Sequence, residues 1–154
     1  GSVVADMQKA AQEVNLCSLC EEVLSKTAMP ENVAATYRVE DDARVTVSDF
    51  SLLKRILSNL TTNAVQAMPE GGRLDVYAYK STDSLLITVQ DTGVGIPDEV
   101  KGKLFTPMFT TKAKGQGFGL AVIKRLTEAL GGTVTYESEL GKGTKFIIRL
   151  PSSH

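Results

Sequence analysis

The chain has 154 residues, of which 42% are hydrophobic, 23% charged and 6% aromatic, so it has the size and composition of one globular domain. This composition excludes a disordered tail, a collagen-like repeat and a disulfide-rich scaffold. The formal net charge of -1, from 17 basic and 18 acidic residues, argues against a nucleic-acid module with a basic surface. No apolar run reaches the ~18 residues that indicate a membrane span.

We expect no secretory signal in this chain, because its first residues lack a basic stretch followed by an apolar one. Gly1 and Ser2 are typical of the scar that a protease leaves when a tag is removed, so we expect a piece of a longer protein. We interpret residues 1–14 as this scar and the remnant of a polar upstream helix or linker. Residues 15–151 then form the domain, and residues 152–154 form a tail.

The two cysteines, Cys17 and Cys20, form a lone Cys-x-x-Cys. A redox motif needs a strand before it and a helix that opens at it, whereas the apolar spacing here predicts the middle of a helix. A zinc site needs two further ligands, and the only histidine is His154 at the chain end. We therefore expect two reduced thiols in a cytoplasmic protein.

The first half of the chain is predicted to alternate helices with short strands. Helical spacing covers residues 16–28 and ends before Pro30, and strands are predicted at residues 33–39 and 43–47. Asp49 is placed to cap a long helix that reaches about residue 67. One apolar stripe runs along this helix: Leu53, Ile56, Leu57, Leu60, Ala64 and Ala67.

The second half is predicted to be two hairpins separated by a loop and a helix. Alternating runs at residues 74–79 and 85–89 indicate the first hairpin, and residues 134–136 and 145–150 indicate the last. Residues 120–130 regain helical spacing and end at a glycine pair. The loop at residues 92–118 is longer than compact domains usually tolerate, so we interpret it as a lid. The whole order predicts a two-layer α+β domain with helices on one face of a mostly antiparallel sheet.

The long helix carries a polar set, Asn59, Asn63 and Gln66, at the border of its apolar stripe. Asn59 and Asn63 are four residues apart and therefore project from neighbouring points on one face. Amide oxygens suit Mg²⁺, a cation that keeps several waters and binds phosphate oxygens. Asparagines that merely face solvent explain the pattern equally well.

Asp91 follows a strand and shares the parity of its apolar residues Leu85, Ile87 and Val89. Strict alternation therefore aims this carboxylate toward the buried layer, where it needs hydrogen-bond donors. At the mouth of a pocket it would accept a hydrogen bond from an exocyclic amine such as that of adenine. The alternative is that Asp91 only caps the turn that it begins.

A glycine cluster at residues 115–119 leads directly into a helix, with Thr110, Thr111, Lys112 and Lys114 before it. Backbone amides at a helix N-terminus, cleared by glycines, bind anions. The cluster is neither a Walker loop nor a Rossmann fingerprint, since it has neither spacing. Taken alone, it fits a flexible surface loop better.

In chain order these features resemble the sequence boxes of two-component sensor histidine kinases. Residues 49–64 resemble their asparagine box, residues 91–97 the first glycine box, residues 104–112 the phenylalanine box, residues 115–120 the second glycine box and residues 141–146 the closing glycine-threonine element. The likeness covers about residues 15–150, and five boxes in the right order do not arise by chance.

The resemblance implies the C-terminal catalytic ATP-binding domain of such a kinase. Its fold is shared with gyrase, heat-shock-chaperone and mismatch-repair ATPases: a mixed, mostly antiparallel sheet packs on about three helices, and a long lid covers the nucleotide. The implied cofactors are ATP or ADP with Mg²⁺. Asn63 would hold the metal, Asn59 would assist near the phosphates, and Asp91 would accept from the adenine amine, directly and through water.

The resemblance also assigns the remaining nucleotide contacts. Gly93 and Gly95 would let the chain pass the base, with Thr144 near the adenine end. The amides of Gly115, Gly117, Gly119 and Leu120 would meet the phosphates. Ile96, Phe109, Thr111 and Lys112 complete the expected set, and Asn59, Asn63 and Lys112 are its catalytic members.

The implied reaction transfers the γ-phosphoryl group to a histidine on a separate dimerisation segment, which this chain lacks. A response regulator would be the downstream partner of the full-length kinase. No contact of this domain with nucleic acid or membrane is expected. The implied location of this domain is the cytoplasm, including the case in which it is the cytoplasmic part of a membrane-anchored receptor.

Two positions depart from the family pattern. Many relatives carry a basic residue where Gln66 stands, which leaves a phosphate contact there open. Hydrolytic branches usually carry a glutamate where Asn59 stands, and an amide cannot act as the base that activates water. The kinase is therefore favoured, while an ATPase, a serine kinase of anti-sigma-factor type and a non-catalytic binding domain remain as alternatives.

Overall fold

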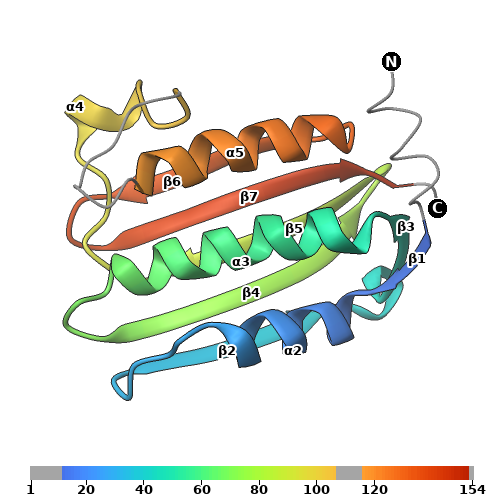
Figure 1. Cartoon of the computed structure of the whole chain (residues 1–154), viewed down its shortest axis with the longest axis horizontal. Coiled ribbons are helices and arrows are strands. Elements are labelled where there is room, and N and C mark those ends of the chain that lie inside the picture. The colour runs from blue at the N-terminus through green and yellow to red at the C-terminus, as the bar shows by residue number, and fades with distance from the viewer. Residues whose placement is uncertain (1–11, 107–115, 153–154) are drawn as a thin grey trace.

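A computed structural model describes residues 12–106 and 116–152, with the helix backbone alone for residues 116–119. Three helices lie side by side on one face of a five-stranded sheet: α2 (Leu16–Lys26), α3 (Phe50–Gln66) and α5 (Gln116–Ala129) (Figure 1). This arrangement confirms the predicted two-layer α+β architecture.

The sheet has the strand order β2-β4-β5-β7-β6. Its strands are β2 (Val33–Val39), β4 (Gly72–Ser81), β5 (Ser84–Asp91), β6 (Thr133–Glu139) and β7 (Gly143–Pro151). Strands β2 and β4 are parallel, and the other neighbours are antiparallel, so the sheet is mixed and mostly antiparallel as expected. A second, two-stranded sheet pairs β1 (Gln12–Asn15) with β3 (Val45–Ser48).

Helix α3 forms as its sequence predicts. The Asp49 carboxylate accepts a hydrogen bond from the backbone N–H of Leu52 at 3.1 Å, which caps the helix start. Burying each large side chain of the apolar stripe contributes about 1.5–3 kcal/mol. The stripe residues that are buried are Leu53, Ile56, Leu57, Leu60 and Ala64.

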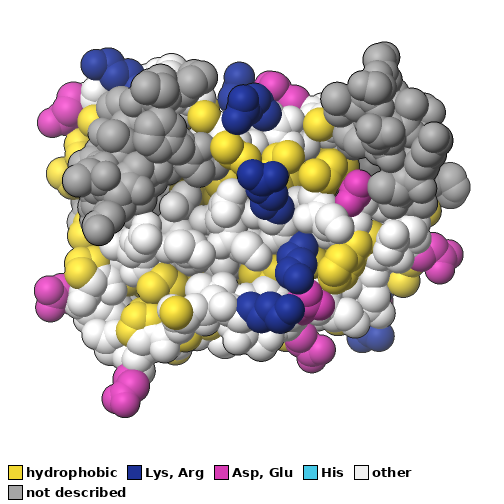
Figure 2. Space-filling view, in the orientation of Figure 1, with side chains coloured by type: hydrophobic (Ala, Val, Ile, Leu, Met, Phe, Trp, Pro, Cys, Tyr) yellow, Lys and Arg dark blue, Asp and Glu magenta, His cyan; other side chains and the backbone are white. Residues whose placement is uncertain are grey.

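Strand β5 is buried on both faces, although only one face carries helices. Leu86 and Thr88 alternate with the core residues yet are only 4% and 3% exposed. Their register partners on β4 are Tyr79 and Tyr77, whose rings stack with centroids 4.9 Å apart. The two tyrosines therefore shield the open face of the central strand. The outer side of the helix layer is mainly polar, and Lys and Arg side chains cross its middle (Figure 2).

Four details differ from the sequence predictions. Residues 12–14 belong to β1 rather than to a helical remnant, because they pair with β3. Asn15 caps α2, so Cys17 lies in the first turn of the helix and not in its middle. A short 3-10 helix occupies Asp41–Ala43, so β3 begins at Val45 and not at residue 43 as predicted. Helix α5 begins at Gln116, one turn earlier than expected.

The end of α3 and the described glycine-rich segments gather at one end of the domain. Helix α3 ends there, β5 reaches Asp91 there, and the turn between β6 and β7 and the start of α5 lie beside them (Figure 1). Strand β3 and the far ends of α5 and β7 lie at the opposite end. Across the described ranges, no helix has the length and apolar character needed to cross a membrane.

Candidate functional site

Asp91 is the buried centre of this end of the domain, with 4% of its surface exposed. Its Oδ1 accepts two backbone hydrogen bonds, from the N–H of Gly93 at 2.8 Å and from the N–H of Thr144 at 3.3 Å. Its Oδ2 has no hydrogen-bond partner in the part of the chain that the structure describes. The carboxylate therefore keeps one acceptor oxygen for another donor, as the parity of β5 predicted.

Burial also sets the acid-base behaviour of this group. Removal from water raises the pKa of the Asp91 carboxyl above its ordinary value, and the two backbone donors offset only part of that rise. A donor on a bound molecule that reaches Oδ2 would stabilise the charged form further. The free oxygen can accept a hydrogen bond from a ligand that offers an N–H group.

Residues 93–96 form a strip that is fixed on both sides by hydrogen bonds. The N–H of Val94 donates to the carbonyl of Ala67, at the end of α3, at 2.9 Å. On the other side the N–H of Gly141, in the β6–β7 turn, donates to the carbonyl of Val94 at 2.8 Å. The first glycine box is therefore held between α3 and the last hairpin.

The glycines of this strip permit that close approach. A Cβ on Gly93 would lie 2.2 Å from the carbonyl oxygen of Ala67, and one on Gly95 would lie 2.3 Å from that of Glu139. Gly143 has a φ of +124°, and a Cβ there would lie 2.1 Å from the carbonyl oxygen of Asp91. The structure thus gives Gly93 and Gly95 a packing reason that the sequence prediction for them, passage beside a base, did not include.

Asn59 and Asn63 follow the edge of α3 that leads to Ala67. The three residues are spaced by four, and Ala67 is the residue that touches the first glycine box. Both asparagines are half-buried. The Asn63 Nδ2 is buried without a hydrogen-bond partner in the described structure. The Asn63 amide group therefore faces a position where the described residues offer no hydrogen-bond partner.

These residues fit a nucleotide-bound Mg²⁺ ion. Among the described side chains no three His, Cys, Asp or Glu residues gather as a metal cluster. Mg²⁺ that binds phosphates needs only one or two protein oxygens, because it retains waters. A half-turn of the Asn63 amide brings its Oδ1 to the position of the unpartnered Nδ2. Asn63 is thus suited to the role predicted for it.

The predicted loop at residues 92–118 is partly ordered by contacts. It contains the short helix α4 (Asp98–Lys101), whose Lys101 carbonyl accepts from the Tyr136 hydroxyl at 3.1 Å. Leu104 is buried, and the Phe105 ring packs on Tyr136 with centroids 5.9 Å apart. The first half of the expected lid is therefore attached to β6.

Several predicted phosphate residues lie outside the described residues: Phe109, Thr111, Lys112 and Gly115. Gly117 and Gly119 fall in the first turn of α5, and Leu120, which follows them, is buried. The first four N–H groups of a helix have no partner within it. The start of α5 therefore brings backbone N–H groups that lack a partner within the helix to the same end of the sheet as Asp91.

Sequence reasoning missed Ser138 on β6. Its hydroxyl contacts Ile96 of the first glycine box and both Gly143 and Thr144 of β7. A signal was present, because Ser138 shares the parity of Val134 and Tyr136, which pack against the core. Asp91 was identified because it is a polar residue at a position where strand parity predicts an apolar one, and the same argument applies to Ser138.

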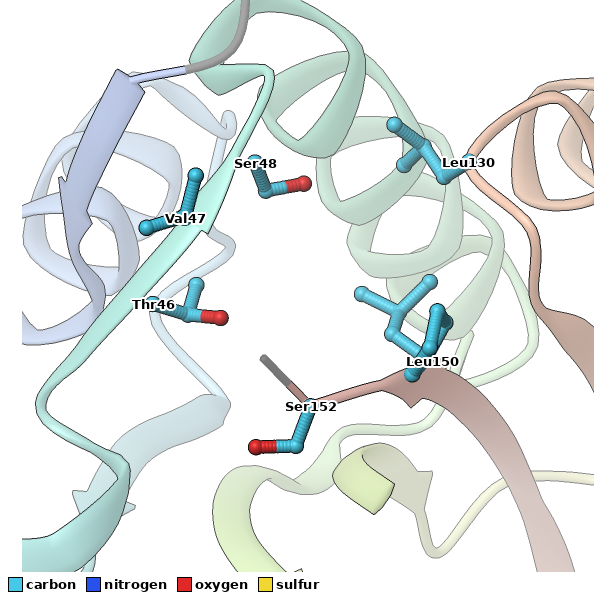
Figure 3. A pocket seen from close by; sticks show the side chains of 7 residues that line it. Thr46, Val47, Ser48, Leu130, Leu150 and Ser152 are labelled. Atoms are coloured by element: carbon cyan, nitrogen blue, oxygen red, sulfur yellow. The ribbon is translucent and has the colours of Figure 1, made fainter. Parts of the chain in front are cut away.

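A pocket lies at the end of the domain opposite to Asp91 (Figure 3). Thr46 and Ser48 of β3 point toward Leu130 and Leu150 across it, and Val47, between them on the strand, points away. Its lining, completed by Pro151 and Ser152, contains no ionisable side chain. None of the predicted site residues lies there, so the candidate site is the one at the Asp91 end.

Comparison with known proteins identifies the family of the chain. Residues 48–154 match the family of histidine kinase-, DNA gyrase B-, and HSP90-like ATPases. Sensor histidine kinase ZraS of Escherichia coli (strain K12) is 36% identical over 145 residues, which are 92% of this chain and 31% of that protein. The chain thus spans about a third of the length of this relative.

Solved structures are similar as well. The catalytic domain of histidine kinase ThkA has a TM-score of 0.79 and 28% identity, with 92% of this chain and 95% of that chain covered. ThkA in complex with response regulator protein TrrA gives a TM-score of 0.74 and 26% identity, covering 93% of this chain and 42% of that one. Full-length ShkA in complex with AMPPNP has a TM-score of 0.81 and 26% identity, with 93% of this chain and 31% of that chain covered.

A two-layer domain with a buried carboxylate, a paired-asparagine helix and a glycine-flanked helix start defines a class of nucleotide-binding domains. The chain belongs to the histidine kinase-, DNA gyrase B-, and HSP90-like ATPase family. Within that family it is the C-terminal catalytic domain of a two-component kinase, as the sequence boxes indicated.

Proposed function

We propose that this domain binds Mg-ATP and supplies the γ-phosphoryl group to a histidine on a separate dimerisation segment of a sensor kinase. The observation that carries the proposal is Asp91: a buried carboxylate with one oxygen on two backbone N–H groups and the other available. The exocyclic amine of adenine is the donor that complements this free oxygen.

The phosphates would lie toward α3 and the start of α5. We assign Asn63 as the protein ligand of Mg²⁺ and Asn59 as a neighbouring polar contact, and Mg²⁺ would neutralise the charge that develops on the transferred phosphoryl group. Lys112, Thr111 and the amides of Gly115, Gly117, Gly119 and Leu120 complete the proposed phosphate contacts. Ile96 and Phe109 would border the base and the lid.

The identity of Asn59 favours transfer to an acceptor over hydrolysis. Hydrolysis needs a base that activates water, and an amide is not a base in the physiological pH range. A histidine acceptor needs no such base, since its imidazole is the nucleophile and the enzyme mainly positions the phosphate. The ATPase and the serine kinase are therefore the less favoured readings.

We propose the dimerisation segment of the parent kinase as the direct partner and a response regulator as the downstream one. The ThkA–TrrA complex supports the second partner by analogy, because its kinase shares this catalytic fold. Residues 15–151 would form the ATP-binding domain, preceded by the β1 residues from Gln12 and followed by a tail. We propose a cytoplasmic location, which fits two free thiols and a need for ATP.

Nucleotide binding is tested first, on the chain alone. Calorimetry with ATP and ADP in the presence of Mg²⁺ is expected to give dissociation constants in the micromolar to millimolar range. A thermal shift on adding nucleotide is expected as well. The absence of both heat and thermal shift at millimolar nucleotide would overturn the proposal.

Transfer is tested with γ-labelled ATP, with and without the parent's dimerisation segment added in trans. The chain alone is not expected to label itself, because its one histidine, His154, is the last residue of the sequence, and phosphoryl transfer needs an acceptor that is held in line with the γ-phosphate. Acid-labile, base-stable label on the added segment supports the histidine kinase. Acid-stable label on serine would favour the anti-sigma-factor type, and rapid phosphate release without an acceptor would favour the ATPase.

A further inference from the structure

Ser138 stands at the junction of the elements that form the adenine end of the site. Its Oγ accepts a hydrogen bond from the N–H of Ile96 at 2.9 Å. It also donates to the carbonyl of Gly143 at 3.0 Å and lies 2.8 Å from the Thr144 Oγ1. One hydroxyl therefore joins the first glycine box to the start of β7.

The number of hydrogens available at this junction bears on which hydroxyl donates in the bond between Ser138 and Thr144. A serine hydroxyl has one hydrogen to donate and two lone pairs to accept with. We assign the hydrogen of Ser138 to the Gly143 carbonyl, which makes Thr144 the donor between the two hydroxyls. Ser138 then has both of its lone pairs occupied, by Ile96 and by Thr144.

This direction determines what the Thr144 hydroxyl offers to a ligand. Once its hydrogen is directed to Ser138, Thr144 Oγ1 acts as an acceptor. Thr144 is buried, pairs with Asp91 in register and donates its N–H to Asp91 Oδ1. Because register partners on antiparallel strands direct their side chains to the same face of the sheet, the Thr144 hydroxyl and the Asp91 carboxylate lie on one face at neighbouring positions. Adenine carries an amine where guanine carries a carbonyl oxygen, so two acceptors favour adenine.

We propose that Ser138 is a specificity-determining positioning residue, which fixes the Thr144 hydroxyl as a hydrogen-bond acceptor and so favours adenine over guanine nucleotides. The inference rests on the proposed nucleotide binding and adds a residue to it. Ser138 acts through Thr144 and does not contact the nucleotide itself. Without its hydroxyl, the Thr144 hydrogen turns freely and donates to the guanine oxygen.

The test compares Ser138→Val with Ser138→Thr in the intact 154-residue chain. Valine and threonine have the same shape and both suit a strand, but only threonine keeps the hydroxyl. Thr135→Val is the matched control, because it removes a hydroxyl from an exposed position of the same strand. Calorimetry gives the affinities for ATP and GTP, and thermal unfolding confirms that each variant is folded. If the valine variant does not fold, Ser138→Ala takes its place.

We expect Ser138→Val to lower the preference for ATP over GTP by about five- to tenfold, the size of one ordinary hydrogen bond. Ser138→Thr and Thr135→Val should keep the preference of the parent. Equal weakening of both nucleotides in Ser138→Val, or no change, would show a purely structural role and overturn the inference. A parent chain that binds both nucleotides equally also overturns it, whereas a parent that binds neither overturns the proposed function.

Discussion

Asp91→Asn replaces one oxygen of a buried carboxylate by an NH₂ group and leaves the shape of the side chain unchanged. The remaining oxygen can still accept from the N–H groups of Gly93 and Thr144, at 2.8 and 3.3 Å in the parent. The new NH₂ group takes the place of Oδ2 and donates where the carboxylate accepted. The variant therefore separates the contact to the base from the contacts that hold the turn.

The expected effect follows from this exchange. A hydrogen bond to a charged group contributes about 1.5–3 kcal/mol, so its loss weakens ATP binding about 10- to 150-fold at about 1.4 kcal/mol per factor of ten. GTP should bind as before or more tightly, because its carbonyl oxygen can accept from the new NH₂ group. Alanine is less informative, since it also leaves two buried N–H groups without an acceptor.

Isothermal calorimetry with both nucleotides measures the effect, and thermal unfolding checks the fold. Asp83→Asn is the control, because it removes one charge from the exposed turn at the other end of β5. The reasoning would be refuted if ATP and GTP weakened equally in Asp91→Asn. Asp91 would then be only a turn cap.

Four further outcomes are expected. Asn63→Ala should remove most of the Mg²⁺ dependence of nucleotide affinity without lowering the unfolding temperature, as titration with and without Mg²⁺ will show. Because burial raises the pKa of Asp91, acid should weaken ATP binding at a higher pH than an ordinary aspartate would, and Asp91→Asn should lack this dependence. A raised pKa also means that the folded protein favours the neutral form of Asp91. The contribution of Asp91 to the free energy of unfolding is therefore full at low pH and falls as the pH rises through the raised pKa. Burial raises the pKa of Cys20 to about 12, so a thiol reagent should label Cys17 and spare Cys20 until the chain unfolds. Gly143→Ala should destabilise the fold by more than about 1 kcal/mol in denaturant unfolding, since a side chain at its φ is strained.

Periodic segments could be predicted from the sequence because their own residues determine them. The stripe of α3 and its Asp49 cap act within one helix, and the observed bounds are Phe50–Gln66. The burial of Asp91 followed from strand parity alone. The strand at Val33–Val39 was predicted with the bounds that it has in the structure.

The remaining features depend on contacts between distant segments. Strand β1 has four residues and exists because β3 pairs with it, so its local sequence carried no strand signal. Residues 92–106 lack periodicity, but Phe105 and Lys101 attach them to β6. The hydroxyl of Ser138 gains its role only when β6, β7 and Ile96 come together.

The close approach of backbone at Gly93, Gly95 and Gly143 has a practical consequence for genetic work on such kinases. A substitution there forces apart two segments of main chain before any nucleotide arrives, since each added Cβ would lie 2.1–2.3 Å from a carbonyl oxygen. Cells that carry such a variant would lose the protein as well as its activity, and the phenotype would resemble a deletion. A silent kinase that keeps its normal abundance is better made by Asn63→Ala or Asp91→Asn, which change polar atoms and leave the main chain in place.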